Sequence, residues 1–265
     1  MGRTYRTVLL VIGLGVLLLA LGFRMHADWV LMMWPVPSGP LSDIFVASIF
    51  AAIAGPLIWI AATSEKAAIV SGSADLLVVN AGMTGTAFWF WSTTGNAKLL
   101  GFGLFTLLMT VLCALVCWKL RHVPFKNNRP TPLVVRIAFG AFALLLAVSA
   151  TRLILIVPNT FPWPLGPETS MFYGFIFLGA MVYFLYGMVF PVWGNAGGQM
   201  VGFLLYDLVL IGPYLRHFAK VAPEMLPSLM VYVGVLIASG LIALWFLFIH
   251  PATRFGAVPV TTRAG

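Results

Sequence analysis

The chain has 265 residues, of which 61% are hydrophobic and 8% are charged, and its net charge is +8. A soluble domain carries about 25% charged residues, so this chain has too few charged side chains to cover a water-facing surface. In a bilayer the same composition is expected, because the outer surface then faces hydrocarbon. The composition therefore excludes an ordinary soluble domain and predicts an all-α, polytopic integral membrane protein.

Apolar runs of the length needed to cross a membrane occur eight times along the chain. A helix needs about 20 such residues to span about 30 Å of hydrocarbon. The runs predict transmembrane helices at 7–23, 43–62, 70–91, 99–118, 134–156, 171–190, 199–215 and 227–249. The third and seventh are the most polar, because each contains an acid, Asp75 or Asp207, and each begins in glycine-rich sequence.

Two segments separated by about half the chain resemble each other, and each lies between two apolar spans. The matching residues, offset by 127 to 129 positions, are Arg24 and Arg152, Trp34-Pro35 and Trp163-Pro164, Gly39-Pro40 and Gly166-Pro167, and Ser42 and Ser170. A period near half the chain length indicates a duplicated unit. Four spans per unit predict parallel repeats, related by a pseudo-twofold axis along the membrane normal.

The predicted organisation follows from this repeat. It consists of a first four-helix repeat over 1–122, a basic, proline-containing cytoplasmic linker over 123–133, a second four-helix repeat over 134–250 and a short cytoplasmic tail over 251–265. The first apolar segment also resembles a signal peptide that could be cleaved after Ala27. Because residues 8–23 correspond to the internal span 136–151, we expect the segment to be retained as a membrane helix.

The distribution of basic residues predicts the orientation. Ten of them fall on the side of the two termini, namely Arg3, Arg6, Lys66, Lys119, Arg121, Lys126, Arg129, Arg136, Arg254 and Arg263. Five fall on the opposite side, namely Arg24, Lys98, Arg152, Arg216 and Lys220. The positive-inside rule therefore predicts that the protein lies in the cell membrane with both termini in the cytoplasm. The two similar segments, 24–42 and 152–170, which we call the Trp-Pro segments, then lie outside.

The basic stretch over 119–136 is the most polar part of the chain between spans. Its bases are expected to lie against anionic lipids of the inner leaflet, each contributing about 1 kcal/mol. An ordinary cytoplasmic loop that obeys the positive-inside rule explains the same stretch without a special partner. Because the loops account for the net charge, we expect no nucleic-acid partner.

The two Trp-Pro segments are too apolar for water-exposed loops and too short to cross the bilayer. Such segments either lie flat in the headgroup layer or form re-entrant stretches that pack against protein. Pro40 and Pro167 predict the first turns of the following helices. Ser42 and Ser170 are the predicted N-caps of those helices.

Two interpretations of the segments remain open. In the first, the tryptophans form an interfacial aromatic belt while the arginines snorkel toward headgroups. Alternatively, the segments meet near the pseudo-twofold axis and cover an outward-facing cavity, with the arginines beneath. The candidate ligand-binding or structural residues of this outer face are Arg24, His26, Asp28, Trp34, Asp43, Arg152, Trp163 and Glu168. The first copy is the more polar, because Ile154 and Ile156 stand where it has His26 and Asp28.

Two acids are candidates inside the membrane. Burying Asp207 near the middle of its span costs about 2.5–3.5 kcal/mol, which makes a functional role the default hypothesis. The alternative is a hydrogen bond to a serine or threonine on a neighbouring helix. Asp75 lies nearer the cytoplasmic end, within reach of water or Lys66.

Several chemistries are disfavoured. The four histidines, His26, His122, His217 and His250, all fall at helix ends or in loops, which argues against haem or pigment ligation, and we expect no cofactor. Cys113 and Cys117 share one helix face, which suits packing rather than a disulfide or a metal site. The chain contains no phosphate loop, no serine-hydrolase motif and no zinc-peptidase motif.

The sequence therefore favours a non-catalytic helical membrane protein. It would be a transport or binding protein for a small molecule or ion, with an outward-facing site on the axis, or an embedded subunit that contacts other membrane subunits. The alternative is a membrane enzyme that acts on a lipid-linked or amphiphilic substrate at the outer face. Such an enzyme would use Arg24, His26, Asp28 and Asp43, with His26 as the base and Asp28 orienting it, or with Arg24 holding a phosphate.

Overall fold

The computed structural model describes residues 2–255, and this part of the chain is helical, without strands. Eight helices are long and apolar enough to span a membrane. They are α1 (Arg3–Arg24), α3 (Pro40–Thr63), α4 (Ile69–Thr94), α5 (Ala97–Leu120), α6 (Leu133–Ile154), α7 (Pro167–Val189), α8 (Trp193–His217) and α9 (Leu226–Leu244). The short elements are α2 (Asp28–Leu31), η1 (Lys66–Ala68), η2 (Pro223–Met225) and the π-helical turn η3 (Trp245–Ile249).

The prediction of an all-helical chain with eight membrane-length helices is confirmed. The boundaries differ most at α8, which begins at Trp193 inside the glycine-rich stretch that was expected to be a loop. The glycines there permit close packing, because a Cβ at Gly197 would lie 2.7 Å from the indole ring of Trp59 on α3. The predicted tail over 251–265 lies largely outside the described residues.

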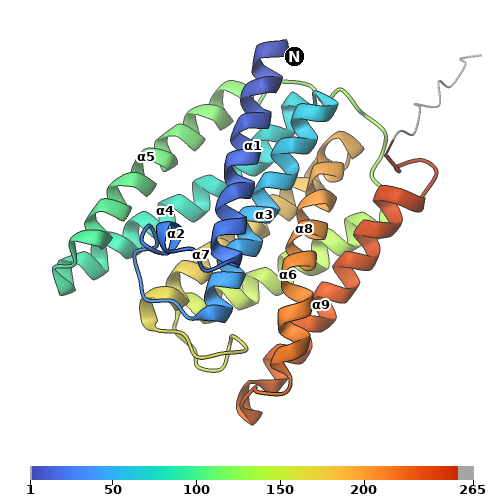
Figure 1. The fold of residues 1–265 in the computed structure, drawn as a ribbon. Helices are drawn as coiled ribbons and strands as arrows, with labels where there is room; N and C mark the ends of the chain where they lie inside the picture. The colour runs from blue at the N-terminus through green and yellow to red at the C-terminus, as the bar shows by residue number, and fades with distance from the viewer. Residues whose placement is uncertain (1, 256–265) are drawn as a thin grey trace, which may run out of the picture.

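The long helices form two layers of four (Figure 1). In one layer the order of packing is α1, α3, α8, α9, and in the other it is α5, α4, α7, α6. Each layer thus combines two helices from the first half of the chain with two from the second. The two halves interleave instead of forming separate bundles.

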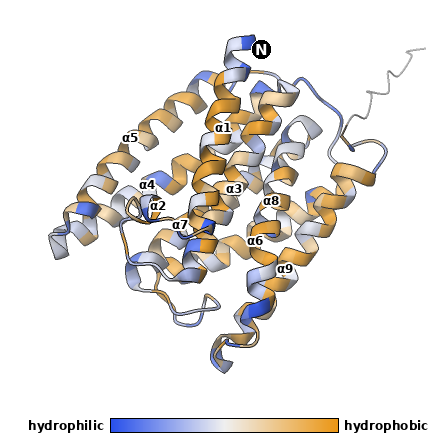
Figure 2. Ribbon diagram, viewed as in Figure 1, coloured by the Kyte–Doolittle hydropathy of each residue, from blue (hydrophilic) through white to orange (hydrophobic). Residues whose placement is uncertain are grey.

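The helices at the ends of the two layers carry the exposed apolar surface. Large hydrophobic side chains are exposed along α1, α5, α6 and α9, whereas α3 is mostly buried. Figure 2 shows apolar residues along the helices, with hydrophilic residues near helix ends and connections. Apolar surface of this extent is expected to contact lipid or another protein, because soluble monomers rarely expose it.

The connections gather at two opposite ends of the molecule. At one end the linker between α5 and α6 meets the α3–α4 connection and the start of α8, as hydrogen bonds from Lys126 N to Glu65 and from Gly194 N to Asn127 show. The two Trp-Pro segments and the α8–α9 connection lie at the opposite end (Figure 1).

The predicted starts of α3 and α7 are confirmed for the prolines and wrong for the N-caps. Pro40 and Pro167 are the first helical residues, as predicted. The predicted N-caps Ser42 and Ser170 are wrong, because Gly39 and Gly166 occupy the cap positions. The prolines start each helix two or three residues before the serines, so the serine side chains form tertiary hydrogen bonds instead.

Candidate functional site

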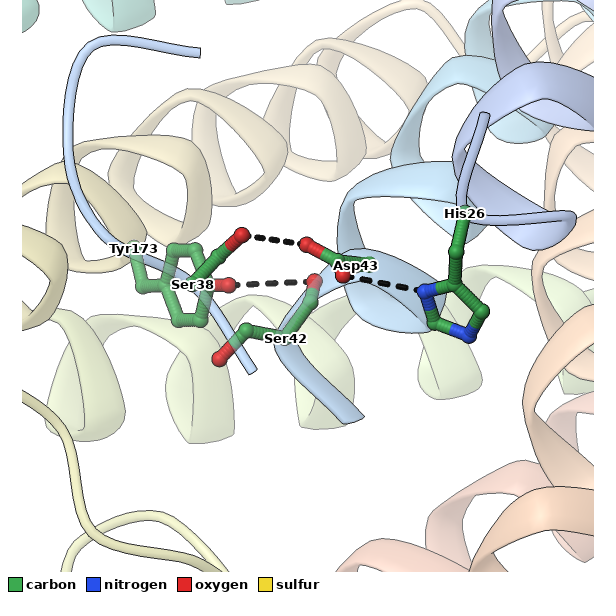
Figure 3. Close-up of polar contacts among 5 residues, drawn as sticks. All are labelled: His26, Ser38, Ser42, Asp43 and Tyr173. Atoms are coloured by element: carbon green, nitrogen blue, oxygen red, sulfur yellow. Dashed lines mark hydrogen bonds and ion pairs between the residues drawn. The ribbon is translucent and has the colours of Figure 1, made fainter. Parts of the chain in front are cut away.

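The first turn of α3 holds the first Trp-Pro segment in place. Asp43, which is only 5% exposed, accepts a hydrogen bond from Ser38 Oγ, and its Oδ2 lies 3.0 Å from His26 Nδ1 (Figure 3). His26 follows α1 and Ser38 precedes α3, so one carboxylate joins both ends of the segment. Two polar residues of the first segment, His26 and Ser38, are thus partners of Asp43.

The same turn of α3 also holds the second segment. Trp163 Nε1 donates to Ser42 Oγ at 3.0 Å. The Tyr173 hydroxyl donates to the Ser42 carbonyl at 3.2 Å (Figure 3). The second segment is further fixed by His217, whose Nε2 lies 2.8 Å from the Pro162 carbonyl. Ser42 and Asp43 therefore connect the two halves at this end of the molecule.

Both tryptophans are core residues and not members of an exposed aromatic belt. Trp34 is 9% exposed and Trp163 is 8% exposed. Trp34 packs edge-on against Phe172 of α7, which belongs to the second half. Since Trp163 contacts α3 of the first half, each segment packs against a helix of the other half.

The two indoles differ in one testable respect. Trp163 Nε1 has Ser42 as partner, whereas the buried Trp34 Nε1 has no partner among the described residues. Trp163→Phe should therefore lower the free energy of unfolding by about 1 kcal/mol more than Trp34→Phe does, because only the first change removes a hydrogen bond. Thermal unfolding of the two variants in mild detergent measures the difference. Equal destabilisation would contradict the assigned Trp163–Ser42 bond.

The remaining residues of the predicted outer face do not join this cluster. Arg24 and Asp28 are exposed, and neither forms an ion pair within residues 2–255. Arg152 is exposed and its Nε donates to Thr160 Oγ1 at 3.3 Å, while Glu168 is half-buried. The two arginines are thus exposed and do not contact the cluster around Ser42 and Asp43. His26 is likewise paired with Asp43 and not with Asp28, because the chain turns back onto α3.

A cavity of about 270 Å³ lies between the two layers. Residues of α3, α4, α6, α7, α8 and α9 line it. The wall is mostly apolar, and the polar residues among those that line it are Ser73, Asp75, Ser149, Tyr183, Gln199, Tyr206, Tyr232 and Ser239. This volume is near the lower end of the range of about 300–1,000 Å³ found for ligand pockets.

Asp75 is the one charged side chain among the residues that line this cavity. It is half-buried and forms no hydrogen bond or ion pair within residues 2–255, so the suggested pairing with Lys66 is not formed. Its carboxylate lies against α7 where Gly179 leaves a notch. The structure thus places an unpaired carboxylate on the wall of an apolar cavity.

Asp207 has a different environment. It is 5% exposed, does not line the cavity, and its Oδ1 accepts a hydrogen bond from Ser239 of α9 at 3.0 Å. This is the helix-to-helix hydrogen bond considered from the sequence as the alternative to a functional role. Asp75 is therefore the acid that a ligand in the cavity can contact, whereas Asp207 forms a hydrogen bond between α8 and α9.

The sequence did not single out the other polar residues of the cavity. Gln199 is fully buried, its Nε2 donates to the Tyr183 carbonyl, and its Oε1 has no partner among the described residues. An amide and several tyrosines within otherwise apolar spans were the available signal. These residues could not be grouped from the sequence, because they come from three helices, α7, α8 and α9.

Comparison of the chain with protein-family models, curated proteins and solved structures yields no match.

Proposed function

We propose that this protein binds and transports a small molecule through the cavity between its two helix layers. The observation that carries the proposal is the unpaired Asp75 carboxylate on the wall of a 270 Å³ cavity among membrane-length helices. Intramembrane ionisable residues are costly and usually mark a functional pathway. The site differs from the outer-face site expected from the sequence, because the cavity lies between the layers and not under the Trp-Pro segments.

A duplicated origin supports this proposal. In the proposed repeat, α1, α3, α4 and α5 of the first half correspond to α6, α7, α8 and α9 of the second. Equivalent helices make equivalent contacts. The α1–α3 pair corresponds to α6–α7, and the α4–α5 pair corresponds to α8–α9. The contacts between halves also match, since α3 packs on α8 as α7 packs on α4. Such paired halves around a central site are typical of transporters, in which one unit moves against the other.

The proposed orientation keeps the termini in the cytoplasm. The linker between α5 and α6 then faces the inner leaflet, and Lys119, Arg121 and Arg136 are exposed there. These side chains are free to contact anionic lipid headgroups.

Two other functions rest on different observations. The exposed apolar faces of α1, α5, α6 and α9 would also suit an embedded subunit of a larger complex. A membrane enzyme would rest on His26, which is partly exposed and oriented by Asp43. Purification in mild detergent tests whether the protein is a subunit of a complex, because a subunit would co-purify with its partner chains.

Cysteine accessibility tests the transport proposal without knowledge of the ligand. In a chain with Cys113→Ala and Cys117→Ala, Ser73→Cys places a thiol on the cavity wall and Leu104→Cys places one on an exposed apolar position of α5. A membrane-impermeant thiol reagent should modify Ser73→Cys in intact cells and in inverted vesicles, but it should leave Leu104→Cys unmodified. The reason is that a transport site is reached by water from each face in turn.

Each outcome of this test has a definite meaning. Modification from one face only would indicate a binding site that opens to that face, which contradicts transport. If Ser73→Cys reacts no faster than Leu104→Cys from either face, the cavity is not a ligand pathway and the proposal fails.

A further inference from the structure

The chemistry of the cavity wall identifies a class of ligand. The Asp75 carboxylate lines the cavity without a partner among the described residues, whereas Gln199 Oε1 is buried against Gly187 of α7. No lysine, arginine or histidine of residues 2–255 is among the lining residues. The cavity therefore offers negative charge without any compensating cation.

The carboxylate and the amide oxygen lie at different heights along α7. Asp75 of α4 lies against Gly179, whereas Gln199 of α8 donates to the Tyr183 carbonyl through Nε2 and its Oε1 lies against Gly187. Gly179 and Gly187 are eight residues apart on one helix, which corresponds to about 12 Å along its axis. A cationic group in the cavity therefore binds at Asp75 and does not reach the Gln199 oxygen.

The rest of the wall fits an apolar, aromatic body. Aromatic side chains come from four helices, and they include Phe142, Phe177, Phe184, Phe203, Tyr206 and Tyr232. Aromatic faces attract cations as well as apolar groups, and the attraction is larger where water is excluded. A bare metal ion does not fit this wall, because it would need several oxygen ligands and only one carboxylate is present.

We propose that the ligand of this cavity is a small organic monocation, an amine with an aromatic or similarly apolar body, whose ammonium group binds Asp75. This inference rests on the proposed function of the cavity as a binding site. An ammonium group carries three donors and no acceptor, which suits a carboxylate without a partner. The cavity volume of about 270 Å³ suits a small ligand.

The test compares a charged probe with a neutral one of the same shape. Phenethylamine and phenylethanol are added to the Ser73→Cys protein, which lacks Cys113 and Cys117, in detergent or lipid nanodiscs. The measured quantity is the concentration of each probe that halves the rate of thiol modification. We expect phenethylamine to protect at a concentration at least about tenfold lower than phenylethanol, because a charge-assisted hydrogen bond is stronger than a neutral one.

Two variants assign the preference to Asp75. Asp75→Asn keeps the shape of the side chain and removes its charge, so the two probes should then protect within about threefold of each other. Asp207→Asn is the matched control, because Asp207 is also an acid within a membrane-length helix but does not line the cavity, and it should keep the tenfold preference. An unchanged rate of thiol modification without probe shows that each variant retains its fold.

The outcomes separate this inference from the proposed function. If Ser73→Cys reacts with the reagent but the two probes protect equally, or neither protects, the cationic ligand is excluded while the accessible cavity stands. A preference for phenethylamine that persists in Asp75→Asn also overturns the inference. If the thiol does not react at all, the proposed function itself fails.

Discussion

Gly179→Ala is expected to destabilise the protein by about 3 kcal/mol, near the upper end of the usual cost of adding an atom to a packed core. A Cβ at this position of α7 would lie 2.8 Å from the backbone oxygen of Asp75 on α4. It would also collide with the Asp75 carboxylate and the Val79 side chain. The backbone of α4 cannot move aside without separating α4 from α7. The higher helix propensity of alanine, about 1 kcal/mol, is too small to offset this cost.

Thermal unfolding in mild detergent measures this effect, with Gly85→Ala as the matched control. Gly85 is in α4, and a Cβ there would have nothing within 4 Å. We expect Gly85→Ala to leave the unfolding temperature unchanged or to raise it slightly. If both variants unfold at the same temperature, α4 and α7 do not approach each other as closely as the structure shows.

Glu65→Ala is expected to release the linker between the two halves and to cost about 3 kcal/mol. Glu65 is 2% exposed, and its two carboxylate oxygens accept hydrogen bonds from Lys126 N at 2.8 Å and Asn127 N at 2.9 Å. Removing the carboxylate leaves two backbone donors without partners, each costing about 1–3 kcal/mol.

The start of α8 depends on the same contact. Trp193 N donates to the Arg129 carbonyl at 2.7 Å, and Gly194 N donates to the Asn127 carbonyl at 3.0 Å. These linker carbonyls satisfy backbone donors that a helix N-terminus otherwise leaves free. A displaced linker should therefore loosen the first turn of α8 as well.

Limited trypsin digestion detects the released linker, because trypsin cleaves after Lys126, whereas Arg129 is followed by Pro130 and is not cleaved. We expect cleavage there to be about 100-fold faster in Glu65→Ala, since each 1.4 kcal/mol corresponds to about a factor of ten in the open population. Glu224→Ala serves as the control, because Glu224 is exposed. Equal cleavage rates in the two variants would mean that Glu65 does not hold the linker.

The long helices could be predicted because each is specified by a local property. About 20 consecutive apolar residues suit a membrane-spanning helix whatever the neighbouring segments do. Pro40 and Pro167 start their helices for an equally local reason, since the fixed φ of proline suits the first helical position. The N-caps were mispredicted because Gly39 and Gly166 begin the helices earlier, which leaves Ser42 free to bond with Trp163.

The polar contacts were predicted only in part. The sequence indicated that the first Trp-Pro segment is the more polar, and the structure shows why, since Asp43 bonds to His26 and Ser38. It could not indicate that Asp43, and not Asp28, is the partner of His26. That choice depends on how the segment turns back onto α3.

By itself, the sequence determined the helical class, the number of membrane-length helices and the position of the repeated segments, because these depend on residues close together in the chain. Only the tertiary structure decided that α3 packs on α8 and α4 on α7, so that the halves interleave in two layers. That packing places Asp75 on a cavity wall and Asp207 against Ser239, although both acids lie in similar apolar spans. The difference arises from which neighbouring helix faces each carboxylate, and no local pattern in the chain encodes it.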